Sequence, residues 1–586
     1  MGWGRSNLPI IAGVGERLPG NAELAEQFDL LADLLELDGA DAFRLSAYRR
    51  AAARIRESAA PVARLALDGK ATQIPGIGGT IAGKIVEFVE TGDLRALARL
   101  RERVPSGLVE VMRVPGLGPK TARRLWEELG VRSLDDLRVA AEKQRLRGLA
   151  GLGPKTEEKV LLAVARPPRS QAATGRILLG RVLAVVQSAL GDLRAHPACV
   201  QASEAGSVRR RAETVRDVDL IATASDPAAL TSHFAALPWV AEAAALGETK
   251  ATVVSYEGFR FDLRVVPPES YGNLLQHFTG SADHNVALRE AAVRRGFSVS
   301  EYGVEDAETG ELVRAASEEE FYALFGYEWI PPELRENRGE LAAARAGRLP
   351  RLLERADIAG DLHVHTDWSD GHATLEEMVL AARAHGHRYV AICDHAKRLR
   401  NGRLERQAEE IARLNESLDE IEILSGVEVD IRADGTLDLD DETLAARDWV
   451  MASVHGGFDQ PRERLTARVV CALENPHVDC IGHPTGRKLN RRPPYELDFE
   501  VVFGRAAETG TFLEVNSQPD RLDLRDAHAR AAVETGVRLV VSTDAHRLHE
   551  LAFLELGVFQ ARRGWVRKED VVNTRPWRDV RAALAR

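Results

Sequence analysis

The sequence predicts a multidomain protein of the α and α/β classes, with a helical N-terminal part, an α/β middle and a C-terminal domain of parallel β/α units. Three observations support this prediction. The chain has 586 residues, which is too many for a single hydrophobic core. Near the N-terminus, apolar residues repeat at helical spacing, as in LAEQFDLLADLLEL. From Asp361 onward, short strand-like runs alternate with helical stretches, which is typical of parallel β/α units.

The composition is that of an ordinary globular protein, with 45% hydrophobic and 28% charged residues. No uncharged apolar run is long enough to span a membrane, and the first residues lack the apolar core of a secretory signal. The four cysteines form no CxxC pair, which fits a reducing cytoplasm. The net charge is −11, yet residues 1–170 are net basic. This asymmetry is compatible with DNA bound at the N-terminal end, and uneven surface charge explains it equally well.

Residues 21–68 predict two or three amphipathic helices, after which one short motif occurs three times. The copies are IPGIGGTIAGKI from Ile74, VPGLGPKTARRL from Val114 and LAGLGPKTEEKV from Leu149. Glycines allow a tight turn between two helices, and the free amides that begin the second helix suit a phosphate. The pattern resembles the helix-hairpin-helix, which binds the DNA backbone without reading bases; the alternative is a purely structural helical repeat. The DNA contacts expected are Gly76, Gly78, Gly116, Gly118, Lys120, Gly151, Gly153 and Lys155.

A carboxylate cluster is predicted in the middle of the chain. RPPRSQAATG (166–175) predicts a linker, and the runs VDLIAT, ATVVSY and FRFDLRVV beyond it predict an α/β domain. Asp217 and Asp219 alternate along a predicted strand, so both carboxylates share one face, and Asp262 follows in FRFDLRVV. Three such carboxylates can hold two divalent ions for in-line phosphoryl transfer, and Mg²⁺ suits an all-oxygen site. A D-x-D on a strand taken alone is more often a solvated face.

The residues that flank these aspartates make the motif more diagnostic than the aspartates alone. G-S-V-R-R followed by E-T-x-x-D-x-D, within 206–219, resembles the nucleotidyltransferase signature of family X DNA polymerases, and residues 277–304 resemble their nucleotide-binding region. The resemblance implies an N-terminal 8-kDa-like domain at 21–95 after a tail at 1–20, fingers at 96–175, a palm at 176–265 and a thumb at 266–335. It also implies Mg²⁺ or Mn²⁺ on the three aspartates, support from Arg260, a DNA contact from Arg289, and nucleotide contacts from Gly206, Ser207, Arg210, His277, Phe278, Gly280 and Asn285.

The sequence departs from that family pattern at a few positions. His277 stands where animal relatives have a tyrosine, and Arg211 and Arg216 replace glycines expected near the triphosphate loop. Lys84 aligns with the Schiff-base lysine of the animal relatives' lyase domain, and Tyr48 in AYRRAA is similar too. Phe43 and Thr80, however, replace a His and a Lys that help hold the phosphate there. A helical lysine without a covalent role is therefore the favoured interpretation of Lys84, and lyase catalysis stays a hypothesis.

Most of the 16 histidines fall between His363 and His549, which suggests metal chemistry. His363 and His365 alternate on one predicted strand, so their rings can share a metal ion. The other candidates stand at predicted strand ends: Asp370, His395, Glu428, His455, His483, Asp544 and His546. Mixed histidine and carboxylate ligands suit zinc or manganese better than magnesium, and such ions activate water against phosphate esters. For any one of these histidines alone, a satisfied buried histidine is the better interpretation. The remaining ones are interpreted as surface residues: His372, His385, His387, His477, His528 and His549.

The set H-x-H, S-D-G, D-H, G-V-E, S-V-H, G-H-P and T-D-A-H resembles the PHP (polymerase and histidinol phosphatase) domain. The resemblance implies a distorted (β/α) barrel at 361–586 that holds two or three Mn²⁺ or Zn²⁺ ions, after a linker at 336–360. It further implies 3′→5′ removal of nucleotides, 3′-phosphatase activity or abasic-site cleavage. The ligands alone do not distinguish these reactions.

The prediction for the whole chain is a DNA-directed DNA polymerase that fills short gaps in DNA repair, with a PHP exonuclease or phosphoesterase activity. The expected partners are gapped or primed DNA and dNTPs, and the expected state is a cytoplasmic, nucleoid-associated monomer. One alternative is a DNA-end binding scaffold with a weak polymerase, whose main activity is PHP phosphoester hydrolysis; Arg211 and Arg216 are its support. Another is a template-independent nucleotidyltransferase that acts on a small molecule, which three DNA-backbone motifs disfavour.

Overall fold

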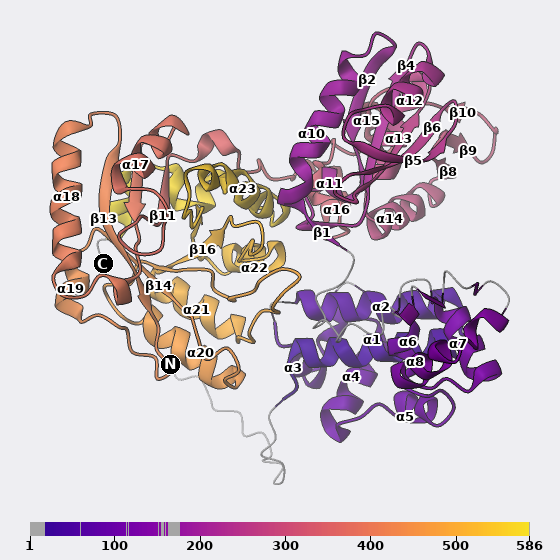
Figure 1. The fold of residues 1–586 in the computed structure, drawn as a ribbon, viewed down its shortest axis with the longest axis horizontal. Coiled ribbons are helices and arrows are strands. Elements are labelled where there is room, and N and C mark those ends of the chain that lie inside the picture. Colours follow the sequence, from indigo (N-terminus) through magenta and orange to yellow (C-terminus); the bar gives the residue numbers. More distant parts are fainter. Residues whose placement is uncertain are drawn as a thin grey trace, which may run out of the picture. The chain divides into compact units, whose positions relative to one another are not determined.

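The structure is a computed structural model that describes residues 18–584, except 59, 75, 113, 115, 116, 150, 151, 154–156, 159 and 162–175. Of the predicted DNA contacts, Gly116, Gly151 and Lys155 lie outside the described residues. The chain divides into two compact units, Met1–Arg169 and Ser170–Arg586 (Figure 1). In the part that the structure describes, no helix is both long and apolar enough to cross a bilayer.

The first unit is entirely helical in its described residues. Its helices are α1 (Asn21–Leu37), α2 (Ala42–Glu57), α3 (Val62–Leu67), α4 (Gly79–Thr91), α5 (Arg95–Arg101), α6 (Leu108–Met112), α7 (Pro119–Leu129) and α8 (Leu134–Glu142), with short η1 (Ala71–Gln73) and η2 (Leu146–Gly148). The predicted amphipathic helices are confirmed, because Leu24, Phe28 and Leu31 of α1 are fully buried whereas Glu23 and Glu26 are exposed.

The second unit begins with a mixed five-stranded sheet in the order β2-β4-β7-β6-β5. Its strands are β2 (Cys199–Glu204), β4 (Val218–Ala224), β5 (Val240–Leu246), β6 (Lys250–Ser255) and β7 (Arg260–Val265), so the three predicted strand-like runs are confirmed. Only β4 and β7 run parallel to each other; the other neighbours are antiparallel. Helices α10 (Leu179–Ala195) and α12 (Pro227–Ala235) pack against this sheet.

Helices and a small antiparallel sheet follow. They are α13 (Tyr271–Thr279), α14 (Ala282–Val293), β8 (Phe297–Ser300), β9 (Gly303–Asp306), β10 (Leu312–Val313) and α15 (Glu318–Ala323). The segment 336–360, expected to be a linker, is instead folded, with α16 (Glu340–Arg345) and η5 (Arg355–Asp357). Leu353 is fully buried and its amide donates to the carbonyl of Val566. Its apolar residues therefore attach it to the body of the second unit.

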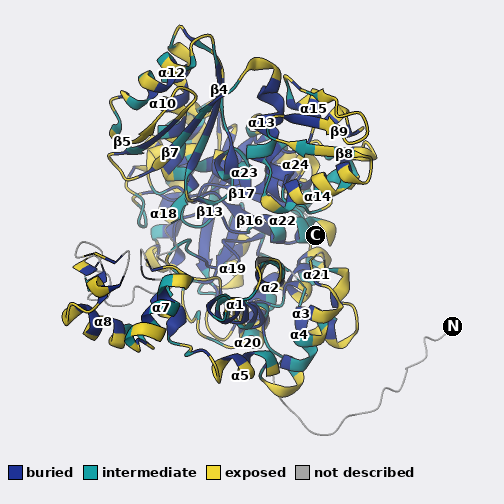
Figure 2. Cartoon of the chain, turned by 90° about the vertical axis from the view of Figure 1, so that its right-hand side faces the viewer, coloured by how far each residue is buried: buried dark blue, intermediate teal, exposed yellow. Residues whose placement is uncertain are grey.

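The C-terminal domain is a parallel sheet of seven strands in sequential order. The strands are β11 (Gly360–Val364), β12 (Tyr389–Ile392), β13 (Glu422–Asp430), β14 (Trp449–Ser453), β15 (Cys480–Ile481), β16 (Phe512–Asn516) and β17 (Leu539–Ser542). A parallel bridge between Val364 and Ala545 brings the two edges together, so the sheet is a nearly closed barrel. Figure 2 shows that β13, β16 and β17 are buried.

Helices surround this barrel (Figure 1). They are α17 (Leu375–Ala384), α18 (Arg403–Ser417), α19 (Asp441–Ala445), α20 (Arg462–Leu473), α21 (Phe499–Thr509), α22 (Asp526–Glu534), α23 (Leu554–Arg563) and α24 (Trp577–Leu584). Two histidines interpreted as surface residues are buried, so that interpretation is wrong for them. His387 precedes β12 and is 2% exposed, and His528 on α22 packs at 4.0 Å against the ring of Phe499. A partly apolar ring can be buried without a ligand, which composition alone does not reveal.

Candidate active sites

The glycine-rich turns of the first unit have the geometry expected for backbone binding. Helix α4 begins after Gly78 and α7 begins after Gly118, while the apolar residue between each glycine pair, Ile77 or Leu117, is buried as an anchor. A Cβ added at Gly78, Gly118 or Gly153 meets nothing within 4 Å, so the surface over these turns is open. Gly76 has a φ of 90°, which favours glycine.

The side chains that bear on the lyase hypothesis differ in burial. Tyr48 is a core residue that packs on Phe28 with ring centroids 6.3 Å apart. Lys84 is half-buried on α4, and Phe43 is exposed. Lys120 of the second motif is exposed at the start of α7. The exposed lysine is therefore free to meet a phosphate, whereas Tyr48 stabilises the helical core.

The three predicted aspartates gather at one end of the β4–β7 pair. Asp219 on β4 lies directly opposite Asp262 on β7, and Asp217 immediately precedes β4. Burial, together with the charges of Asp217 and Asp262, raises the pKa of Asp219 to about 6. Three crowded carboxylates repel one another unless cations lie between them, so the donor set fits divalent ions.

Two neighbours fix Asp262 in place. Burial alone raises the pKa of this carboxyl group, but hydrogen bonds from Arg260 and Thr252 hold it below its usual value. The Arg260 Nε lies 2.9 Å from Asp262 Oδ2. Arg260 is thus placed to orient a carboxylate, as the family resemblance implies.

Gly206 lies against one of these carboxylates, that of Asp219. Its φ is 60°, and a Cβ added there comes within 2.5 Å of Asp219 Oδ2. The residue therefore has to be glycine for the Asp219 carboxylate to lie where it does. Ser207 follows on α11 (Gly206–Arg209), half-buried.

The arginines after Ser207 are held by specific partners. Arg210 donates to the carbonyl of Thr279 at 2.8 Å and pairs with Glu336 at 3.0 Å. Arg211 pairs with Glu204 at 2.9 Å and its guanidinium lies 4.7 Å from the ring centroid of Phe559. Arg211 is therefore engaged with its own domain and with α23, and Arg216 is exposed.

The end of α13 and the start of α14 carry the other predicted nucleotide contacts. Asn285 donates to the carbonyl of His277 at 2.7 Å and accepts from Gln276, so its amide joins the two helices. A Cβ at Gly280 comes within 2.4 Å of the Asn285 amide oxygen, which explains the glycine. The Arg264 guanidinium carbon lies 4.5 Å from the ring centroid of Phe278. Arg289 is exposed on α14.

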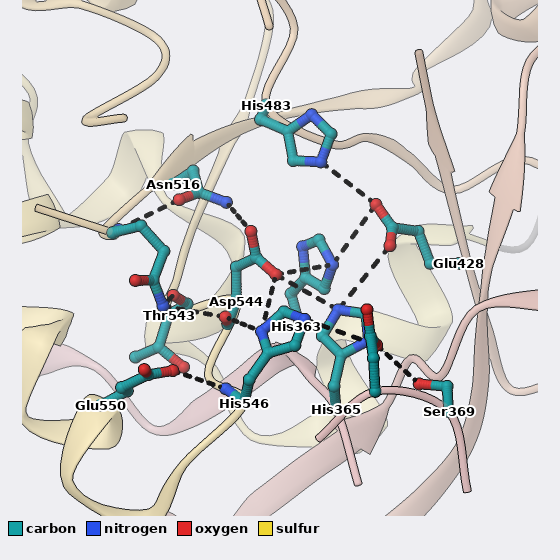
Figure 3. Close-up of polar contacts among 12 residues, drawn as sticks. His363, His365, Ser369, Glu428, His483, Asn516, Thr543, Asp544, His546 and Glu550 are labelled. Atoms are coloured by element: carbon teal, nitrogen blue, oxygen red, sulfur yellow. Dashed lines mark hydrogen bonds and ion pairs between the residues drawn. The ribbon is translucent and has the colours of Figure 1, made fainter. Parts of the chain in front are cut away.

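The nine predicted ligands of the C-terminal domain converge at the carboxyl ends of the barrel strands. Figure 3 shows how His363, His365, Glu428, His483, Asp544 and His546 face one another. Eight of them form three overlapping groups whose donor atoms lie within 4.8 Å: His365, Asp370, His395 and His546; His363, His365 and Asp544; and His395, Glu428 and His455. The ninth, His483, has its Nε2 3.2 Å from Glu428 Oε1. Glu428 lies among five imidazoles, as expected of a bridging carboxylate.

Orphaned donor atoms show that this cluster fits metal ions. Buried atoms of His363, His365, His395 and Glu428 have no hydrogen-bond partner among the described residues. Burial and the neighbouring His546 lower the pKa of His365 to about 3, so its imidazole is neutral, the form that binds metals. Such unsatisfied, converging atoms are costly unless an ion satisfies them.

Carboxylates behind the ligands escaped the sequence analysis. Glu514 on β16 accepts from His363 Nδ1 at 2.7 Å, and Asp430 lies 2.5 Å from His455 Nδ1. Asp394 accepts from Thr366, Ser369 and Gln407 beside the ligand Asp370. Such partners fix the ring orientation and the tautomer of a ligating histidine. Their positions at strand ends, in TFLEVNS, GVEVD and CDH, were the available signal.

Together these sites define a class of protein: one with a nucleotidyl-transfer centre, built from aspartates on and beside two neighbouring strands, and a phosphoesterase centre in a β/α barrel. Comparisons with known proteins agree. Family models match for the DNA polymerase beta thumb (274–336), the helix-hairpin-helix domain (19–94), the SAM-like helix-hairpin-helix tandem (108–166) and the PHP domain (361–517). The chain is 40% identical over 573 residues to the DNA polymerase/3′-5′ exonuclease PolX of Bacillus subtilis (strain 168), covering 96% of this chain and 99% of that protein. The chain belongs to this family, the family X DNA polymerases with a PHP domain.

The C-terminal domain has relatives of its own. A probable phosphatase of Thermoanaerobacter sp. (strain X514) is 31% identical over 226 residues, which cover 36% of this chain and 89% of that protein. A probable phosphatase of Caldanaerobacter subterraneus is 34% identical over 198 residues, 32% of this chain and 75% of that protein. The barrel therefore also occurs without polymerase domains.

Proposed function

We propose that the chain is a DNA-directed DNA polymerase that fills short gaps in base excision or strand-break repair, and that its PHP domain removes nucleotides from 3′ ends. The observation that carries the proposal is that one chain holds two groups of metal-binding side chains. The aspartates lie together at one end of the β4–β7 pair, and the histidines and carboxylates lie together at the carboxyl ends of the barrel strands. Gapped or primed DNA and dNTPs are the proposed substrates.

At the polymerase centre, Asp217, Asp219 and Asp262 would hold two Mg²⁺ or Mn²⁺ ions. These ions would lower the pKa of the primer 3′-hydroxyl and neutralise the triphosphate. Arg260 orients Asp262, and Gly206 lets the Asp219 carboxylate approach the helix that begins the triphosphate loop. Ser207 lies in the first turn of that helix, where free amide groups favour phosphate, and Arg210 at the C-cap would contribute its guanidinium instead.

At the PHP centre, the nine converging side chains would hold two or three Mn²⁺ or Zn²⁺ ions, which would activate water against a phosphate ester. Glu514 and Asp430 fix the rings of His363 and His455 by accepting from their Nδ1 atoms, so that Nε2 of each ring faces the cluster. Exonuclease action is proposed ahead of 3′-phosphatase action or abasic-site cleavage, because the full-length relative carries that activity in its name.

The helix-hairpin-helix turns would bind the DNA backbone on both sides of a gap. The open surface at Gly78 and Gly118 and the exposed Lys120 support this role. A nucleoid-associated, cytoplasmic monomer is proposed; the four cysteines, all free, fit the reducing compartment. Arg211 no longer supports the scaffold alternative, since its guanidinium is bound to Glu204 and Phe559, whereas Arg216, exposed beside Asp217, remains its support.

Gap filling is tested by comparing single-nucleotide incorporation on a one-nucleotide gap with a 5′-phosphate and on the same primer with an open template. The proposal predicts a kcat/KM about 10-fold or more higher on the gap, because the first hairpin motif then binds the downstream strand. Equal values contradict gap filling. A chain that shortens the primer on both substrates and extends neither supports the scaffold alternative.

A further inference from the structure

The loop after β16, residues 517–523, contacts both the PHP centre and the palm. On the metal side, Gln518 donates to the carbonyls of Thr543 and Asp544, and Arg521 Nε lies 3.5 Å from Asp544 Oδ2. On the palm side, a Cβ at Gly180 of α10 comes within 2.9 Å of Pro519, and Leu522 belongs to the hydrophobic core of the palm. This loop is therefore fixed by two domains at once.

Arg521 is an unusual residue to find at a centre that fits cations. A guanidinium is always charged, the Arg521 side chain is 14% exposed, and its Nε has no hydrogen-bond partner among the described residues. Arg521 already pairs with the ligand Asp544 through Nε, but its charge repels the metal ions that this cluster fits, and an anion bound between guanidinium and ions would offset that repulsion. The anion that this centre has to receive is a phosphodiester, for which the planar guanidinium offers paired donors.

The position of Arg521 depends on Glu213 of the palm, which acts through Arg487 of the PHP domain. Arg487 donates from Nε to the carbonyl of Arg521 at 2.8 Å and from Nη2 to the carbonyl of Leu522. The same guanidinium forms a two-pronged ion pair with Glu213, at 2.6 and 3.3 Å, and its side chain is only 7% exposed. Glu213 comes four residues after the palm helix α11. Leu522 has a φ of 46°, a strained backbone conformation, and the ion pair between Arg487 and Glu213 links this loop to the palm.

We propose that Arg521 binds the phosphate of the nucleotide being removed at the PHP centre, and that Glu213 of the palm positions Arg521 through Arg487. Arg521 contacts substrate and is therefore a binding residue of the exonuclease, whereas Glu213 acts only through the loop. The proposal rests on the exonuclease function proposed above and deepens it: the PHP centre takes its substrate phosphate with the help of the polymerase domain.

The first test measures 3′-end removal from single-stranded DNA by the full-length chain. Arg521→Ala should lower kcat/KM about 10- to 100-fold, mostly through KM, because a charged hydrogen-bond partner of the substrate is lost. Inhibition by a deoxynucleoside 5′-monophosphate should weaken by a similar factor, with the metal content of the protein unchanged. Arg521→Lys should fall between wild type and alanine, and it carries the test if the alanine variant does not fold.

The second test separates positioning from general stability with a double-mutant cycle. Glu213→Gln should raise KM about 3- to 5-fold, and this effect should disappear when Arg521 is already alanine. The matched control is Glu333→Gln, which breaks another ion pair to the PHP domain, with Arg562 at 2.7 Å, and should leave KM unchanged.

Three results overturn the inference. An unchanged KM and monophosphate inhibition in Arg521→Ala refute phosphate binding, and loss of bound metal in that variant shows that Arg521 merely supports Asp544. A Glu213→Gln effect that persists in full without Arg521 refutes the positioning role. A wild type that removes no 3′ nucleotides contradicts the proposed exonuclease instead, so the two failures are distinguishable.

Discussion

Replacing Gly206 with alanine tests how the palm holds its catalytic carboxylate. The added Cβ comes within 2.5 Å of Asp219 Oδ2, whereas ordinary contacts begin near 3.4 Å. The carboxylate therefore has to recede by about 1 Å, a displacement that costs roughly 100-fold in rate when it moves a reacting centre. The backbone contributes separately, because a φ of 60° in a residue with a Cβ costs about 1–2 kcal/mol.

The assay is single-nucleotide incorporation on gapped DNA, with 3′-end removal by the same preparation as the internal reference. Gly206→Ala should lower incorporation about 100-fold and leave removal within about 2-fold, since the PHP ligands are untouched. Gly258→Ala is the matched control, because Gly258 also has a positive φ, of 81°, but a Cβ there meets nothing within 4 Å. Gly258→Ala should lower the free energy of unfolding by a similar amount but should reduce the rate of nucleotide incorporation only slightly. Equal incorporation by the two variants refutes the reasoning, because strain and not the clash would then explain the loss.

Three further predictions follow from other sites. Glu514→Gln removes the charge that holds His363 Nδ1 and should weaken ion binding at the PHP centre about 10-fold or more, measured by competition with a chelator. His387 is 2% exposed, and burial together with Arg355 lowers its pKa to about 3; because the unfolded chain binds this proton below about pH 6.5, stability falls as pH decreases from there. His387→Phe should therefore remove about 2 kcal/mol of the loss in unfolding free energy between pH 7 and pH 5, measured with urea. Lys120→Ala should weaken DNA binding a few-fold and lower the salt dependence by about one ion, whereas Lys143→Ala at the end of α8 should not.

Each of these predictions has a clear contrary result. Unchanged ion affinity in Glu514→Gln means that the hydrogen bond to His363 does not support the ligand. Parallel stability curves for wild type and His387→Phe mean that the histidine takes up its proton as readily in the folded protein as in the unfolded chain. Equal salt slopes for Lys120→Ala and Lys143→Ala exclude a phosphate contact by the Lys120 side chain.

The pattern of residue types predicted both centres because strand alternation and strand ends are local properties. His363 and His365 needed only an alternating strand to point the same way, and Asp219 and Asp262 needed only two neighbouring strands. The segment 336–360 was mistaken for a linker because its prolines and charges outweighed Leu352 and Leu353, which are buried.

Contacts between distant parts of the chain were beyond this reasoning. Glu514 meets His363 across the barrel, and Glu213 meets Arg487 from another domain, although neither pair has any sequence pattern that links its members. Likewise, Arg211 looked like an obstacle at the triphosphate loop, and only its partners Glu204 and Phe559 show where it points. Such interactions depend on tertiary packing, which residue types at a given spacing do not encode.

The central claim is that one chain carries two separate catalytic centres, and a pair of variants on one substrate tests it most directly. Wild type, Asp217→Ala/Asp219→Ala and Asp370→Asn/Glu428→Gln are incubated with 5′-labelled one-nucleotide-gapped DNA, dNTPs and Mg²⁺ or Mn²⁺. The account predicts that the first variant only shortens the primer and the second only extends it. If either variant loses both reactions while remaining folded, or if the first still extends the primer, the assignment of the two centres is contradicted.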